Sequence, residues 1–222
     1  MLYPSPEQTL EAGRLRVLAR HLAPKSIHRF RGDFYDVIPT EDGAVITMGD
    51  VFGSGAAAAT AVARLRHAAR VLCLPGMAPA TILTLLNEDL TRDAQPPMAS
   101  LVVARFSHES VTWAQAGHFA PILLRNGRGR SLPRPGGVAL GLTAQARYQE
   151  GQLTLRTGDT VIFLTDGLIG SLDGDTDPVT QLVRGFGRAW REGGPAAVLD
   201  GFLRPTEDEA CVVAVELMAP LA

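Results

Sequence analysis

The sequence predicts an α+β fold with antiparallel strands. Strand-like runs occur in groups, helix-like runs occur in groups, and short turns of hairpin type join several of the strands. A parallel sheet would instead need strands that alternate with helices along the chain. With 222 residues, 46% of them hydrophobic, the chain is long enough for one large domain with an ample core.

The N-terminal part of the chain predicts mainly strands. Residues 6–12 are compatible with a short helix that passes into a strand over residues 15–22. The runs FYDVIPT (34–40) and AVITMGDV (44–51) have the β-branched and aromatic composition of strands. The segment PTEDG (39–43), where the first run ends and the second begins, has the Pro, Asp and Gly residues of a hairpin turn, so we expect the two runs to form a hairpin.

Two helices are predicted next. The alanine-rich segment 55–74 contains neither Pro nor Gly after its first residue, which favours a helix. Pro75 and Gly76 end this helix, and the segment 78–94 predicts a second one because its leucines are spaced to share one face.

Strands return after the second helix. We expect them over residues 99–106, 110–117 and 120–126, twice within 152–168, and last over 209–218. Two helical stretches, 178–190 and 194–203, precede the final strand.

Composition excludes several classes of protein. The formal net charge of −2 and the scattered arginines argue against a nucleic-acid-binding protein, which usually carries a basic stripe. No apolar run has the length of a membrane helix, and the N-terminus has no apolar signal core, so we expect a cytoplasmic protein. Cys73 and Cys211 lack the spacing of a zinc site, and we expect both to be small core residues.

Four aspartates stand at the ends of predicted strands: Asp33, Asp50, Asp166 and Asp208. If they converge, they form a site for hard cations, because Mg²⁺ and Mn²⁺ prefer carboxylate and carbonyl oxygens. The alternative is that they are solvated turn residues. That alternative is weaker for Asp50 and Asp166, which adjoin strongly apolar runs, but spacing alone leaves the two interpretations balanced.

Five sequence blocks follow one another along the chain. They are RGDFYD (31–36), GDVFGSG (49–55), QAGHFAP (115–121), GDTVIFLTDGL (158–168) and DEAC (208–211). In content and order they resemble the metal-dependent serine/threonine protein phosphatases, in particular their bacterial SpoIIE/RsbU-like branch. The resemblance runs from about residue 15 to 218, and it selects the metal site over the solvated turns.

The resemblance implies an antiparallel β-sandwich flanked by helices, an α-β-β-α arrangement of the phosphatase type. It also implies that this fold holds two or more Mn²⁺ or Mg²⁺ ions. Asp50 would bridge two metals, and the carbonyl oxygen of Val51 would complete one coordination sphere. Asp33 would serve the second metal, whereas Asp166 and Asp208 would hold the first. A water activated between the metals would attack the phosphorus of a phosphomonoester.

The resemblance also implies a substrate and partners. Relatives of this branch remove phosphate from serine or threonine of an anti-anti-sigma, STAS-like regulatory protein in stress-response signalling through a sigma factor. We expect residues 1–222 to form a single catalytic domain without a sensor domain. This domain is either constitutively active or activated by a separate protein or by formation of a homodimer. Two alternatives are a catalytically silent pseudophosphatase that acts as a binding module in a partner-switching pathway, and a phosphomonoesterase for small molecules.

The chain departs from the family pattern at a few positions. Phe52 stands where classical relatives carry a proton-donating histidine, so no general acid is identified. His118 is the nearest substitute, but we expect it to close a turn and donate to a backbone carbonyl. We expect Asp36 to support the metal ligands or cap a turn. Glu209 and Cys211 replace an aspartate and a threonine of the last block.

Overall fold

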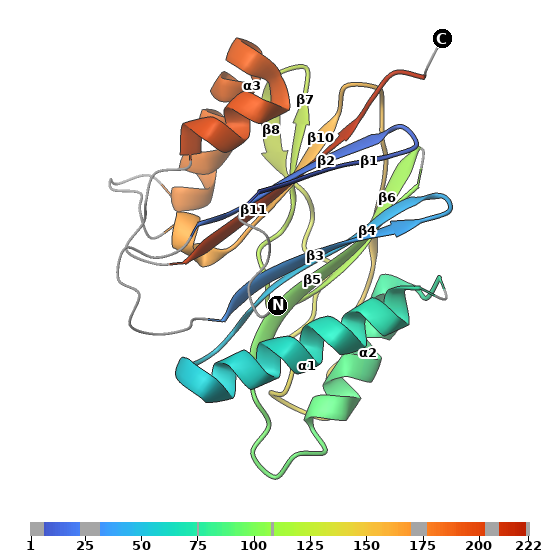
Figure 1. Ribbon diagram of the computed structural model, residues 1–222, viewed down its shortest axis with the longest axis vertical. Coiled ribbons are helices and arrows are strands. Elements are labelled where there is room, and N and C mark those ends of the chain that lie inside the picture. The colour runs from blue at the N-terminus through green and yellow to red at the C-terminus, as the bar shows by residue number, and fades with distance from the viewer. Residues whose placement is uncertain are drawn as a thin grey trace. The chain divides into compact units, whose positions relative to one another are not determined.

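The computed structural model describes residues 7–22, 32–74, 76–107, 109–169, 177–202 and 209–220. The chain divides into two compact units (Figure 1). The first unit draws on His28–Phe119 and Pro133–Thr154, and the second on Ser5–Ile27, Ala120–Leu132 and Leu155–Ala222. Each unit is built around one antiparallel sheet with helical structure packed on it, as the predicted α+β class requires.

The first unit contains a five-stranded sheet in the order β3-β4-β5-β6-β9. Its strands are β3 (Asp33–Thr40), β4 (Gly43–Val51), β5 (Ala99–Phe106), β6 (Ser110–Ala116) and β9 (Gly151–Thr154). Helices α1 (Gly55–Cys73) and α2 (Pro79–Leu90) cover one face of this sheet (Figure 1). Both strands of the predicted β3–β4 hairpin and both predicted helices are therefore confirmed.

The core of the first unit lies between this sheet and the two helices. Alternate strand residues such as Phe34 and Val45 point toward the helices, which present Leu65 and Leu86 in return. Small alanines on the buried side of α1, such as Ala61, let the helix approach the sheet closely. Close packing of this kind fixes the strand ends that carry Asp33 and Asp50.

The second unit contains a six-stranded sheet in the order β1-β2-β11-β10-β7-β8. Its strands are β1 (Glu7–Ala12), β2 (Leu15–Leu22), β11 (Ala210–Leu217), β10 (Thr160–Leu164), β7 (Ile122–Arg125) and β8 (Arg128–Ser131). Helix α3 (Pro178–Phe202) packs on this sheet, and a short 3₁₀ turn, η1 (Asp166–Leu168), follows β10. Gly193 and Gly194 leave the helical conformation, so α3 consists of two helical segments, as predicted.

One element prediction is wrong: residues 7–12 do not form a helix. Residues Glu7–Ala12 form β1, which pairs with β2 through a tight turn where Gly13 has a φ of +57°. The sequence EQTLEA has good helix formers, but pairing with β2 decides its conformation, because tertiary context overrides intrinsic propensity. Strand β8 was also not predicted, since only four residues of polar composition form it.

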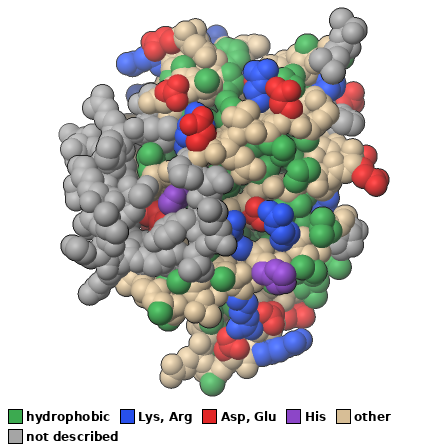
Figure 2. Space-filling model, in the orientation of Figure 1, with side chains coloured by type: hydrophobic (Ala, Val, Ile, Leu, Met, Phe, Trp, Pro, Cys, Tyr) green, Lys and Arg blue, Asp and Glu red, His purple; other side chains and the backbone are tan. Residues whose placement is uncertain are grey.

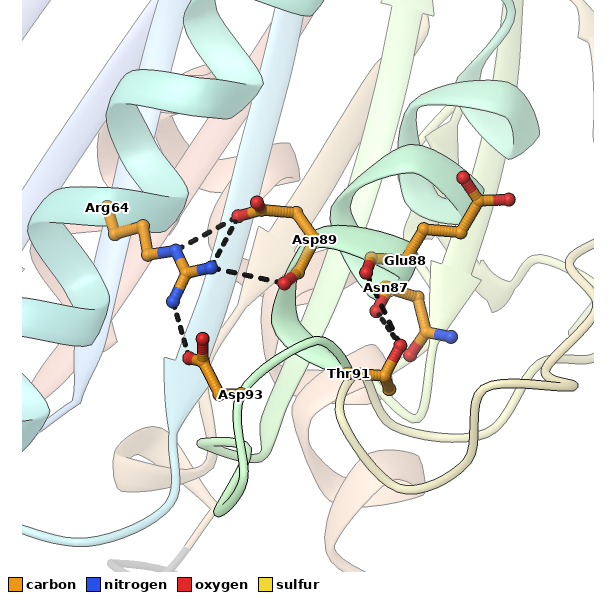
Figure 3. Close-up of polar contacts among 6 residues, drawn as sticks. All are labelled: Arg64, Asn87, Glu88, Asp89, Thr91 and Asp93. Carbon is orange, nitrogen blue, oxygen red and sulfur yellow. Dashed lines mark hydrogen bonds and ion pairs between the residues drawn. The ribbon is translucent and has the colours of Figure 1, made fainter.

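Two arginines on α1 bind aspartates in different surroundings. Arg70 forms a bidentate pair with Asp36 on β3, with Nε and Nη2 donating at 2.8 and 2.6 Å. Asp36 is only 7% exposed, and its hydrogen bonds raise the pKa of the Arg70 guanidinium. Arg64 instead donates to Asp89 and Asp93 beside the end of α2, where both carboxylates are exposed to solvent (Figure 3).

This difference predicts unequal costs for two matched substitutions. Arg70→Met should lower the free energy of unfolding by about 2–3 kcal/mol, because it leaves a buried carboxylate without its cation. Arg64→Met should cost less than about 1 kcal/mol, since an exposed ion pair contributes little. Urea unfolding followed by circular dichroism measures both values. Equal costs would contradict the prediction.

Both cysteines are buried in the core, as predicted. Burial raises the pKa of the Cys73 thiol to about 11, so the thiol stays protonated at neutral pH.

The surface carries charges of both signs. On the face shown in Figure 2, Lys and Arg side chains are interspersed with Asp and Glu side chains. Within the described part of the chain, none of the helices has the length and apolar character that crossing a membrane requires.

Candidate functional site

Asp33 and Asp50 lie directly opposite each other on the neighbouring strands β3 and β4. Directly paired residues of an antiparallel sheet share one face, and carboxylate oxygens of the two residues lie within 4.8 Å of each other. Asp33 is 4% exposed and Asp50 is half-buried. Two carboxylates in this arrangement repel each other unless a cation or a proton lies between them. The pair therefore has the arrangement of a cation site.

The backbone around Gly32 brings further oxygen atoms to this pair. The Val51 N–H donates to the Gly32 carbonyl at 3.1 Å. A Cβ atom added to Gly32 would overlap both the carbonyl oxygen of Val51 and Oδ1 of Asp50. These two oxygens therefore lie together against the bare Cα of Gly32, which explains why this position requires glycine.

The donor set fits a hard cation. The Asp33 and Asp50 carboxylates and the Val51 carbonyl supply only oxygen atoms, which are the ligands that Mg²⁺ and Mn²⁺ prefer. That the Val51 carbonyl completes a metal coordination sphere stays a prediction.

Ser100 extends the row of polar side chains onto β5. It lies opposite Asp50 in the β4–β5 register, and its Oγ is 2.7 Å from Nδ1 of His118. His118 is 4% exposed, and Gln115 donates to its carbonyl oxygen at 3.2 Å. His118 was expected to donate to a backbone carbonyl, whereas its Nδ1 contacts the hydroxyl of Ser100. Ser100 was not predicted as a site residue, because none of the sequence blocks contains it. The strand register is the signal that identifies Ser100.

Asp36 does not belong to this row, so its expected support of the metal ligands or of a turn is wrong. It lies three residues beyond Asp33 on the same strand, and therefore on the opposite face of the sheet. Its carboxylate is bound by Arg70 on that face.

Asp166 belongs to the second unit, where it opens the turn η1 after β10. The residue before it is fixed to β11: the Thr165 N–H donates to the Cys211 carbonyl at 3.1 Å, and the Cys211 N–H donates to Thr165 Oγ1 at 2.8 Å. The Asp166 side chain is exposed to solvent. Strand β10 and this double anchor thus place an exposed carboxylate at the end of the sheet.

The structure brings Asp33, Asp50 and Val51 together within the first unit and places Asp166 in the second unit. Asp208 lies outside the described residues. Its neighbour Glu209 is buried, and Oε1 of Glu209 is 2.6 Å from Nε2 of His21.

The chain is similar in sequence and in fold to known proteins. Phosphoserine phosphatase RsbU of Bacillus subtilis is 23% identical over 167 residues, which cover 73% of this chain and 47% of the relative. The chain thus spans about half the length of that curated relative. The RsbU and RsbW domains of a Mycobacterium tuberculosis protein match with a TM-score of 0.79 at 22% identity, over 98% of this chain and 63% of theirs.

A third similar structure is that of RsbX in complex with magnesium. It matches with a TM-score of 0.73 at 16% identity, over 95% of this chain and 99% of its own. The PP2C phosphatase domain of SpoIIE from Bacillus subtilis also matches, with a TM-score of 0.75 at 16% identity, over 92% of this chain and 62% of its own. These likenesses confirm the predicted fold class, in which two antiparallel sheets are flanked by helices, as in such phosphatases.

The sequence profile of the family described as Stage II sporulation protein E (SpoIIE) matches residues 40–217. The matched range contains Asp50, Val51, Asp166 and Asp208, and Asp33 lies seven residues before it. Because the match covers most of the chain, this protein belongs to the SpoIIE family.

Proposed function

We propose that the protein is a metal-dependent phosphatase that removes phosphate from phosphoserine or phosphothreonine. The observation that carries this proposal is the cross-strand pair Asp33–Asp50, with the Val51 carbonyl oxygen beside it. Membership in the SpoIIE family and the likeness to phosphatase structures support the same reaction.

In this proposal Asp50 would hold both of two cations, Asp33 would hold one of them, and Asp166 and Asp208 would hold the other. The Val51 carbonyl would supply a further oxygen ligand. When bound, two Mn²⁺ or Mg²⁺ ions would activate a water molecule and stabilise negative charge on the phosphoryl oxygens. The magnesium in the RsbX complex and the all-oxygen donors here support such ions.

The residues of this chain have defined tasks in that reaction. Asp33 and Asp50 share one face of the sheet, so both carboxylates are presented to the same point without any movement of the backbone. Glycine at position 32 allows Val51 and Asp50 to approach that point together. Buried His118 and Ser100 hold each other in place next to Asp50, which restricts the Ser100 side chain to one orientation.

We further propose that the substrate is a phosphorylated regulatory protein of the anti-anti-sigma, STAS-like type, in the cytoplasm. The similar protein RsbU is a phosphoserine phosphatase, and one matching structure joins an RsbU domain to an RsbW domain, which supports a role in partner switching. A separate activator protein and a homodimer are parts of the same proposal.

Hydrolysis of p-nitrophenyl phosphate, with Mn²⁺ and with EDTA, tests the reaction. We expect turnover only with the metal, and a loss of about a hundredfold in Asp166→Asn, because the lost ligand weakens one metal site. Asp42→Asn is the matched control, since Asp42 is an exposed residue in the turn at the other end of β3 and β4. It should retain wild-type activity.

Two outcomes would overturn the proposal. Equal turnover with metal and with EDTA would exclude a metal-dependent reaction. Failure of the folded protein to release phosphate both from p-nitrophenyl phosphate and from a phosphorylated anti-anti-sigma domain, with Mn²⁺ present, would favour a catalytically silent binding module.

A further inference from the structure

A buried histidine–carboxylate pair lies in the second unit, next to the turn that carries Asp166. Nε2 of His21 on β2 is 2.6 Å from Oε1 of Glu209, which directly precedes β11. His21 is 8% exposed and Glu209 is 1% exposed. A buried carboxylate is costly without a strong hydrogen bond, so this short contact fixes the Glu209 side chain.

The backbone of residues 209–211 packs against the turn that carries Asp166. A Cβ atom added to Gly167 would overlap the Glu209 carbonyl oxygen, so the turn rests directly on the backbone of Glu209. Two hydrogen bonds between Thr165 and Cys211, at 3.1 and 2.8 Å, fix the other side of Asp166. In the β2–β11 register, His21 lies opposite Cys211. One short segment therefore contacts His21 on one side and the Asp166 turn on the other.

We infer that His21 is a positioning residue for metal binding: through Glu209, it holds the backbone on which the Asp166 turn rests. This inference rests on the proposed function, because it takes Asp166 as a metal ligand. Without His21, the buried Glu209 carboxylate loses its 2.6 Å contact, and its side chain can adopt another orientation. Such a change would shift the carbonyl against which Gly167 packs, and with it the direction of the Asp166 carboxylate.

Binding of Mn²⁺ to the metal-free protein, measured by isothermal titration calorimetry, tests this role without relying on turnover. We expect His21→Leu to weaken Mn²⁺ binding by about tenfold or more, the usual effect of removing a residue that orients a metal ligand. His21→Gln should restore most of the affinity, because the amide N–H can donate to Glu209. If His21→Leu does not fold, His21→Asn replaces it, since this side chain is too short to keep the hydrogen bond.

A matched control separates positioning from general stability. Arg125 on β7 forms a bidentate pair, at 2.8 and 2.6 Å, with the buried Asp159, which lies at the other end of β10 from Asp166. Arg125→Met should therefore lower stability in urea, as His21→Leu does, but leave Mn²⁺ affinity unchanged.

The outcomes are distinct. Weaker binding in His21→Leu, with recovery in His21→Gln and none of the loss in Arg125→Met, supports the inference. Wild-type affinity in His21→Leu, or equal losses in His21→Leu and Arg125→Met, overturns it while the proposed function stands. Absence of Mn²⁺ binding by the wild-type protein would overturn the proposed function and this inference together.

Discussion

Asp50→Asn should abolish metal-dependent turnover and at the same time stabilise the metal-free protein. Asp50 lies directly opposite Asp33, so the substitution removes a like-charge repulsion that costs about 1 kcal/mol in the absence of a cation. The same substitution removes the proposed bridge between the metals. We expect a loss of about a thousandfold in kcat/KM, which corresponds to about 4 kcal/mol of transition-state stabilisation.

Urea unfolding in EDTA and in Mn²⁺ measures both effects on one protein. The wild type should gain about 2.7 kcal/mol when the free Mn²⁺ concentration is a hundred times its dissociation constant. Asp50→Asn should gain much less, whereas the control Asp42→Asn should behave as the wild type does. A variant that is less stable than the wild type in EDTA would show that the two carboxylates do not repel each other in the native protein.

Gly32→Ala should disrupt both the fold and the proposed metal site. The added Cβ would overlap backbone atoms of Val51 as well as Oδ1 of Asp50, and backbone cannot move aside as a flexible side chain can. We expect the free energy of unfolding to fall by about 3 kcal/mol, at the upper end of the usual cost of overpacking. Mn²⁺ binding should weaken too, because the displaced atoms are the proposed metal ligands.

Gly76→Ala provides the comparison for Gly32→Ala. Gly76 has a φ of +76°, but a Cβ atom there would meet nothing within 4 Å. Its cost should be about 1 kcal/mol from backbone strain alone, with no change in Mn²⁺ affinity. Urea unfolding gives the free energy of unfolding of both variants, and calorimetry gives their Mn²⁺ affinity. Equal destabilisation of the two variants would contradict the steric argument, and so would wild-type Mn²⁺ affinity in Gly32→Ala.

The sequence predicted the elements whose signals are local. The alanine-rich helix and the β3–β4 hairpin follow from composition, from turn residues and from the stop at Pro75. Residues Glu7–Ala12 were interpreted as a short helix because their preference for a strand comes only from pairing with β2. A partner elsewhere in the chain decided their conformation, and composition cannot reveal such a partner.

In the candidate site too, residues with a local sequence signal were predicted, whereas residues that depend on distant strand neighbours were not. Asp33 and Asp50 stood out because carboxylates adjoined apolar strands, and their position on one face needed only the hairpin register. Ser100 and His21 stood out in no motif, because each acquires its role through a strand neighbour far away in sequence. Asp36 was assigned to the site by its proximity to Asp33 in sequence, but the alternation of a strand places it on the other face, with Arg70.

The position of β11 has a consequence for synthesis of the protein. This strand, Ala210–Leu217, is inserted between β2 and β10, so it completes a sheet that began with residues near the start of the chain. A nascent chain that ends before residue 210 exposes the edges of both strands, and open strand edges promote aggregation. The second unit can therefore close only after residues 210–217 have been translated, and the Asp166 turn acquires its support from Glu209 and Cys211 at that same step.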